Sequence, residues 1–134
     1  MKTVMVFGTF DGMHPGHDYF LAEARRHGDR LVVCLARDVV VLKLKGHNPQ
    51  QGEEERREEL AESSSVSEVI YGDREIGSWL SVELLKPDVI AFGYDQRELK
   101  QELMNWLSEK GKKIEIVDIL PFQPERYKSS LIYD

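Results

Sequence analysis

The sequence has little that would place it among extracellular, membrane-spanning or nucleic-acid-binding proteins. Its single cysteine, Cys34, has no second cysteine in the chain to form a disulfide with. Its apolar runs fall well short of the roughly 18 residues of a membrane span, and its first residues do not resemble a signal peptide. Eighteen basic against 24 acidic residues give a net charge of −6, without a basic stripe. We therefore expect a cytoplasmic protein that binds neither membranes nor nucleic acid.

What remains is the composition of a globular domain. The 134 residues are 41% hydrophobic and 31% charged, and this length is enough to bury a substantial core. We expect residues 1–134 to form a single domain. Cys34 lies within an apolar run and is expected to be buried and reduced.

Five short apolar runs rich in β-branched residues predict strands. Their apolarity is continuous rather than alternating, which is typical of strands covered on both faces. The runs are Val4–Phe7, Leu31–Ala36, Glu68–Tyr71, Asp88–Phe92 and Ile114–Ile119. Helical segments alternate with them, so the sequence predicts an α/β fold, a doubly wound, Rossmann-like, five-stranded parallel sheet with helices on both faces.

The helical segments are recognised by apolar residues three and four positions apart. One apolar face contains Phe20, Leu21 and Ala24, a second contains Ile76, Trp79, Leu80 and Leu84, and a third contains Leu99, Leu103, Trp106 and Leu107. Glycines 28 and 111 are expected to end the first and third helices, and Pro87 the second. The acidic run 53–61 predicts a solvated helix, and Lys43–Gly52 a long polar loop.

The stretch GTFDGMHPGH, residues 8–17, joins the first predicted strand to the first helix. In open α/β sheets, ligands bind outside the carboxyl ends of the strands, and free N–H groups at a helix N-terminus attract anions. His14 precedes the helix and His17 lies in its first turn, so both can donate to one phosphate group. Gly8 allows a ligand close to the backbone, Gly16 leaves the helix entrance open, and Pro15 fixes the backbone between the histidines.

Two other interpretations of these histidines are open to the sequence. In the first, both histidines are simply polar residues of a turn. We consider this less consistent with the sequence, because two histidines flank a glycine directly after a predicted strand. Alternatively, Asp11, His14 and His17 hold zinc, but no second cluster of ligands accompanies them. We therefore predict no protein-held metal. Neither a P-loop nor a GxGxxG fingerprint follows a strand.

The residues GTFD followed by HPGH resemble the signature of the cytidylyltransferase-like nucleotidyltransferases, which join a nucleoside triphosphate to a phosphate-bearing acceptor and release pyrophosphate. The resemblance extends over nearly the whole chain. Its inner segments, Ala36–Asp38, Lys43–Gly46, Glu55–Glu58 and Gly93–Gln96, look most like the archaeal-type FAD synthases, which are FMN adenylyltransferases. Glycerol-3-phosphate cytidylyltransferases resemble these segments less closely. Arg126–Ser130 looks like the second family signature, although its spacing differs from the cytidylyltransferase form and the chain ends four residues later.

The resemblance implies roles for particular residues. It implies that His14, His17, Lys43 and Arg126 are catalytic. It implies a nucleotide site of Gly8, Thr9, Phe10, Gly16, His17, Gly93, Tyr94, Asp95, Gln96, Tyr127, Ser129 and Ser130. It implies an acceptor site of Asp11, Asp38, Lys43, Lys45 and Arg56. Each role has a structural alternative. The lysines could be solvated, although we favour the functional role, Arg56 could form i,i+4 ion pairs, and the serines could be helix caps.

The implied reaction sets the expected ligands. Triphosphate chemistry implies Mg²⁺ or another divalent cation, held mostly by phosphate oxygens and water. The expected partners are small molecules, and the sequence leaves open whether the chain forms a homodimer. Tyr94 offers a face for stacking and Gln96 both donates and accepts, so we favour ATP over CTP and FMN as acceptor. The alternatives are a CTP-dependent enzyme acting on glycerol 3-phosphate or a similar alcohol or sugar phosphate, and a nucleotide-binding module without turnover.

Overall fold

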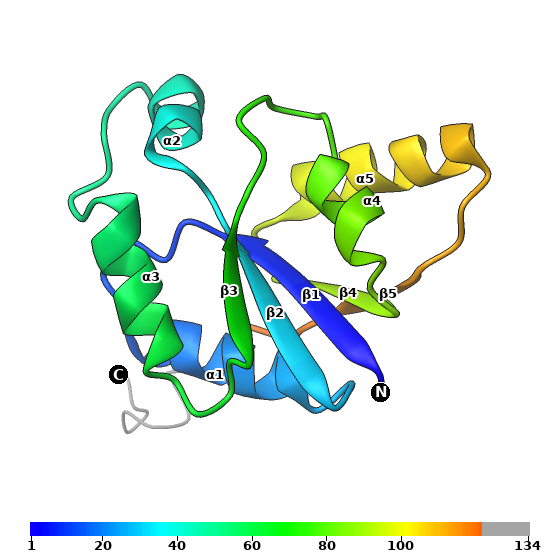
Figure 1. Cartoon of the computed structure of the whole chain (residues 1–134), viewed down its shortest axis with the longest axis horizontal. Helices are drawn as coiled ribbons and strands as arrows, with labels where there is room; N and C mark the ends of the chain where they lie inside the picture. Colours follow the sequence, from blue (N-terminus) through cyan, green and yellow to red (C-terminus); the bar gives the residue numbers. More distant parts are fainter. Residues whose placement is uncertain (122–134) are drawn as a thin grey trace.

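The chain forms a five-stranded, all-parallel sheet in the order β3-β2-β1-β4-β5 (Figure 1). This computed structural model describes residues 1–121. The strands are β1 (Thr3–Gly8), β2 (Arg30–Leu35), β3 (Glu68–Tyr71), β4 (Val89–Phe92) and β5 (Glu115–Asp118). All five predicted strands are confirmed to within a residue at each end. The three inner strands are largely buried, as continuous apolar runs predict, whereas the edge strands β3 and β5 are partly exposed.

Helices cover both faces of the sheet, as predicted. They are α1 (Pro15–Arg25), α2 (Asp38–Lys45), α3 (Glu53–Ala61), α4 (Leu80–Leu85) and α5 (Arg97–Lys110). Leu21 of α1 and Leu60 of α3 pack with Val4 and Val6 of β1 on one face. Met5, on the opposite face of β1, packs with residues of α4 and α5. This alternation along β1 makes the sheet the middle layer of a doubly wound fold, with α2 standing above its carboxyl edge (Figure 1).

The expected loop Lys43–Gly52 begins instead as the end of helix α2. Val41 of this helix is buried, and Gly46 ends the helix with a φ of 77°, a conformation that favours glycine. The apolar residues before Lys43 therefore extend a helix through both lysines, and the irregular segment is confined to residues 46–52.

The predicted helical face of Ile76, Trp79, Leu80 and Leu84 is wrong. Helix α4 begins only at Leu80, and its buried residue is Val82. Trp79 is buried before the helix, where its ring meets Phe7 edge-on at a centroid distance of 5.7 Å. Ile76, Leu80 and Leu84 are exposed. Spacing alone did not show that the turn Glu75–Ser78 interrupts the helix.

The single cysteine behaves as expected from its place in β2. Cys34 is buried and free. Burial raises the pKa of its thiol to about 11, so the group stays protonated at neutral pH. Among residues 1–121, none of the helices has the length and apolarity needed to cross a bilayer.

Candidate active site

The stretch Gly8–His17 lies at the carboxyl edge of the sheet, beside its topological switch point. Strand β1 is central: the chain runs from it to β2 and β3 on one side, and then crosses to β4 and β5 on the other. Crevices at such a point are where open α/β sheets bind ligands. The site is therefore built at the end of the central strand of the sheet, with α1 starting beside it.

The two histidines form one unit at the start of α1. His14 is the N-cap, and its Nδ1 accepts a hydrogen bond from the Gly16 N–H at 3.1 Å. The Nδ1 of His17 accepts from the His14 N–H at 3.3 Å, and the two rings stack with centroids 3.7 Å apart. Because each Nδ1 is an acceptor, each neutral ring carries its proton on Nε2. Both histidines thus present an Nε2–H donor away from the backbone.

This capping changes the expected anion site. The N–H groups of His17 and Asp18 donate to the His14 carbonyl, and those of His14 and Gly16 donate to the imidazoles. Pro15 has no N–H group. The first turn of α1 therefore lacks the free N–H groups that the sequence analysis assumed, and its donors for an anion are the two Nε2–H groups.

Two glycines of the motif, Gly8 and Gly16, lie in close contact with aromatic rings of the same loop. A Cβ on Gly8 would lie 2.5 Å from the ring of Phe10, and a Cβ on Gly16 would lie 2.9 Å from Cε1 of His14. Phe10 is buried, has a φ of 51°, and meets the His17 ring edge-on. The two glycines are thus required by the packing of the loop itself, beyond any approach of a ligand.

His17 is held neutral by its surroundings. Burial, followed by the neighbouring His14, lowers the pKa of His17 below its ordinary value of 6.5, and Asp18 and Asp95 oppose that shift. A neutral imidazole keeps the donor and acceptor roles that the capping requires.

We expect this shift to be measurable as pH-dependent stability. As the pH drops below 6.5, the His17 side chain is protonated in the unfolded chain before it is protonated in the folded protein. The free energy of unfolding should therefore decrease as the pH is lowered, until the pKa of folded His17 is also passed. Denaturant unfolding between about pH 5 and 7.5 measures this slope. In a His17→Asn variant the free energy of unfolding should depend less steeply on pH than in the wild type. Equal slopes for wild type and His17→Asn would contradict the assignment.

Arg56 is buried at the junction of three loops rather than exposed on an acidic helix. Its Nε donates to the Gln51 carbonyl at 3.0 Å, and its Nη1 donates to the carbonyls of Thr9 and Ala36, both at 2.9 Å. Its Nη2 pairs with Oδ1 of Asp38 at 2.6 Å. The side chain is fully buried. The expectation that Arg56 binds the acceptor directly therefore does not fit this structure, because the guanidinium is enclosed and its bonds hold the loop of Thr9 in place.

Two carboxylates assigned to the acceptor also have structural partners. Asp38 accepts from Arg56 through Oδ1 and from the Glu53 N–H through Oδ2. Asp11 accepts from the N–H groups of Gln50 and Gln51. The bond from Gln50 is the main cause that lowers the pKa of Asp11. Asp11 thus joins the β1–α1 loop to the segment before α3, and Asp38 joins the start of α2 to the start of α3. Asp11 also borders the second cavity described below.

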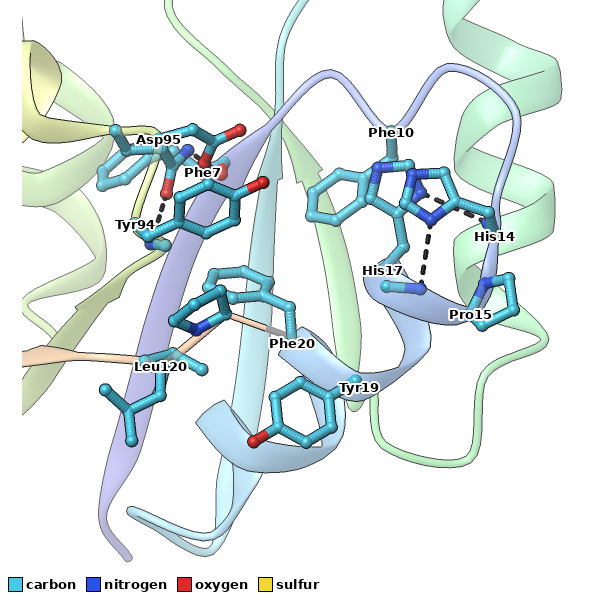
Figure 2. A pocket seen from close by; sticks show the side chains of 15 residues that line it. Phe7, Phe10, His14, Pro15, His17, Tyr19, Phe20, Tyr94, Asp95 and Leu120 are labelled. Atoms are coloured by element: carbon cyan, nitrogen blue, oxygen red, sulfur yellow. Dashed lines mark hydrogen bonds between the residues drawn. The ribbon is translucent and has the colours of Figure 1, made fainter. Parts of the chain in front are cut away.

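Two cavities meet at the histidine pair. The first, of about 480 Å³, is lined by Phe7, Phe10, His14, Pro15, Gly16, His17, Tyr19, Phe20, Gly93, Tyr94, Asp95, Gln96, Ile119, Leu120 and Pro121. Figure 2 shows the histidines on its α1 side, facing Tyr94 and Asp95. The second, of about 840 Å³, is lined by Thr9, Phe10, Asp11, His14, His17, Leu44, Lys45, Ile76, Tyr94, Asp95, Gln96, Arg97, Glu98, Leu99 and Glu102.

The structure brings together many of the expected site residues. Tyr94 and Asp95 border both cavities, and Gly93 borders the first. Gln96 borders both, but its amide donates to the Phe7 carbonyl and accepts from the Gly93 N–H. These bonds tie β1 to β4 and leave the Gln96 amide less free to recognise a base than expected.

The two lysines expected at the site differ in their positions. Lys45 borders the second cavity, whereas Lys43, on the same helix, borders neither cavity as the described residues define them. Arg126, Tyr127, Ser129 and Ser130 lie outside the described residues. Within residues 1–121, no three His, Cys, Asp or Glu side chains gather as a metal site.

Several apolar residues that line the cavities were not predicted from the sequence. Tyr19, Phe20 and Leu120 border the first cavity, and Leu44, Ile76 and Leu99 border the second. Leu44 carried a signal, because it is an aliphatic residue between two lysines. Leu120 and Pro121 follow the last strand at the carboxyl edge, which is where open α/β sheets place ligand contacts.

The chain is similar in sequence and in fold to known proteins. The model of the cytidylyltransferase-like family matches residues 5–133. An FAD synthase of Ferroglobus placidus is 44% identical over 121 residues, covering 89% of this chain and 76% of the relative. One from Methanothermobacter thermautotrophicus is 43% identical over 119 residues, covering 87% and 78%. The crystal structure of the lipopolysaccharide core biosynthesis protein from Thermoplasma volcanium GSS1 is 34% identical with a TM-score of 0.84, covering 92% of this chain and 99% of that one. The chain belongs to the cytidylyltransferase-like family.

Proposed function

We propose that this chain is an FMN adenylyltransferase, which makes FAD and pyrophosphate from ATP and FMN. One observation carries the proposal: two cavities share the histidine pair, so two substrates can meet at its Nε2–H donors. The nucleotide occupies the first cavity and FMN the second. Similarity to FAD synthases over most of both chains supports the choice of substrates.

The reaction needs positioning and charge stabilisation. An oxygen of the FMN phosphate attacks the α-phosphorus of ATP and forms a new P–O bond. The bond from the α-phosphorus to the α,β-bridging oxygen breaks, and its electron pair leaves on pyrophosphate. The Nε2–H groups of His14 and His17 donate to the phosphate oxygens that gain charge in this step. Lys45, at the second cavity, neutralises the acceptor phosphate.

A divalent cation, Mg²⁺, accompanies the triphosphate and offsets its charge. The donor set described above fits this arrangement. Imidazole and ammonium groups bind phosphate oxygens, and no group of three metal-ligating side chains is found in residues 1–121. Bound with the triphosphate, the ion would be held mainly by phosphate oxygens and water and would supply positive charge there.

Pyrophosphate release with each pair of substrates tests the proposal. ATP or CTP is combined with FMN or glycerol 3-phosphate in the presence of Mg²⁺, and we expect turnover for ATP with FMN. Faster release with CTP and glycerol 3-phosphate would assign the chain to the cytidylyltransferases. Nucleotide binding without release in any combination would identify a binding module.

A further inference from the structure

We infer that Leu44 and Ile76 hold the isoalloxazine ring of FMN in the second cavity and thereby select a flavin over a small alcohol phosphate. The inference rests on the proposed function, because it concerns how the acceptor of that reaction is recognised.

The two side chains come from different segments and border the same cavity. Leu44 lies in the last turn of α2 and is 65% exposed, and Ile76 lies in the β3–α4 connection and is 51% exposed. Both segments rise above the carboxyl edge of the sheet (Figure 1). Neither side chain belongs to the core, since α2 buries Val41 and the connection buries Trp79.

A flat, largely apolar ring would remove this aliphatic surface from water. Leu99, at the start of α5, is a third apolar residue of the same cavity and packs on the core beneath it. The cavity of about 840 Å³ is the larger of the two that meet at the histidines. Its volume is typical of sites for ligands of cofactor size. A three-carbon phosphate would leave Leu44 and Ile76 uncovered.

Two cationic side chains, Lys45 and Arg97, line the cavity among four carboxylates, and they can complement the rest of FMN. Lys45 follows Leu44 directly and lines the same cavity as the histidine pair, so its ammonium group can neutralise the FMN phosphate. Arg97 and Glu98, in the first turn of α5, supply a donor and an acceptor on the same cavity. The pyrimidine edge of the isoalloxazine has carbonyl oxygens and an N–H group that pair with such side chains. The ring is thus bounded by apolar residues while its polar edge meets charged ones.

Polar substitutions at the two aliphatic residues test the inference. Leu44→Asn and Ile76→Asn should each raise the KM for FMN about tenfold, because each places an amide against the ring, and should leave the KM for ATP within about twofold. Leu84→Asn is the matched control: Leu84 is 75% exposed on α4 and does not border this cavity. Because all three side chains are exposed, folding should survive each substitution.

A binding measurement separates ring recognition from turnover. Quenching of flavin fluorescence gives the affinity for riboflavin, which has the ring but no phosphate. Riboflavin binding should weaken about tenfold in Leu44→Asn and Ile76→Asn and stay unchanged in Leu84→Asn. If the wild-type protein makes FAD but both variants keep wild-type affinities for FMN and riboflavin, the ring lies elsewhere and the inference is overturned. If the wild-type protein makes no FAD, the proposed function itself fails, and this inference with it.

Discussion

Replacing His14 with asparagine is expected to lower kcat for FAD formation about 100- to 1,000-fold, with a smaller change in the KM for ATP. In the proposed mechanism the Nε2–H of His14 donates to charge that develops only in the transition state, so losing this donor should lower kcat more than it changes KM. Asparagine keeps an oxygen close to the position of Nδ1, where it can still accept from the Gly16 N–H and cap α1. The variant therefore removes the outer donor while retaining the cap.

Two further variants make this result specific. His14→Gln places an amide N–H near the position of Nε2 and should recover part of the lost kcat. His27→Asn replaces an exposed histidine at the far end of α1 and should have wild-type kinetics. A kcat for His14→Asn within about threefold of wild type would remove His14 from the mechanism.

Replacing Arg56 with methionine is expected to lower the free energy of unfolding by about 3 kcal/mol. The substitution removes every donor that Arg56 directs at the carbonyls of Thr9, Ala36 and Gln51, and it leaves the Asp38 carboxylate without its cation. Each buried acceptor left without a donor costs free energy, whereas methionine restores only the packing of the side chain.

Urea unfolding of Arg56→Met and of its neighbour variant Arg57→Met measures this effect. Arg57 is exposed on the same helix, so its replacement should change the free energy of unfolding by no more than about 0.5 kcal/mol. Similar losses for the two variants would show that Arg56 has no special structural role. Arg56→Lys should lie between wild type and Arg56→Met, because an ammonium keeps the charge without the planar fork.

The sheet could be predicted from the sequence because its signal is local. Each strand is a continuous apolar run, and its neighbours in the chain show helical spacing, so the alternation alone indicates a parallel sheet. The histidine motif was also readable, since His14 and His17 lie three residues apart around a helix start. Their mutual capping was not, because it depends on ring orientations that spacing does not specify.

The roles of Asp11, Asp38, Arg56 and Gln96 were not readable from the sequence. Arg56 bonds to Thr9, 47 residues away in the chain, and Gln96 bonds to Phe7, 89 residues away. A charged or amide side chain looks the same in sequence whether it meets a ligand or a distant carbonyl. Only the fold distinguishes the two, by burying Arg56 and by bringing β1 beside β4.

The apolar residues that line the second cavity could not be predicted from the sequence either. Ile76 fits a helical repeat with Trp79, Leu80 and Leu84, and a repeat of this kind normally marks a core face. Here only Trp79 of the four is buried, and α4 starts too late to include Ile76. An aliphatic residue outside the core cannot be told from a core residue by its spacing.

The arginine of α3 also limits how this active site can be engineered. Grafting residues 8–17 onto another α/β scaffold would transfer both histidines and both glycines. It would not transfer the guanidinium of Arg56, which donates to the Thr9 carbonyl in this protein. The transplanted loop would then be free to adopt other conformations, and the two imidazoles would lose their fixed position over the sheet. A working transplant has to include α3, or an equivalent buried cation, so the smallest portable unit of this site is far longer than its signature.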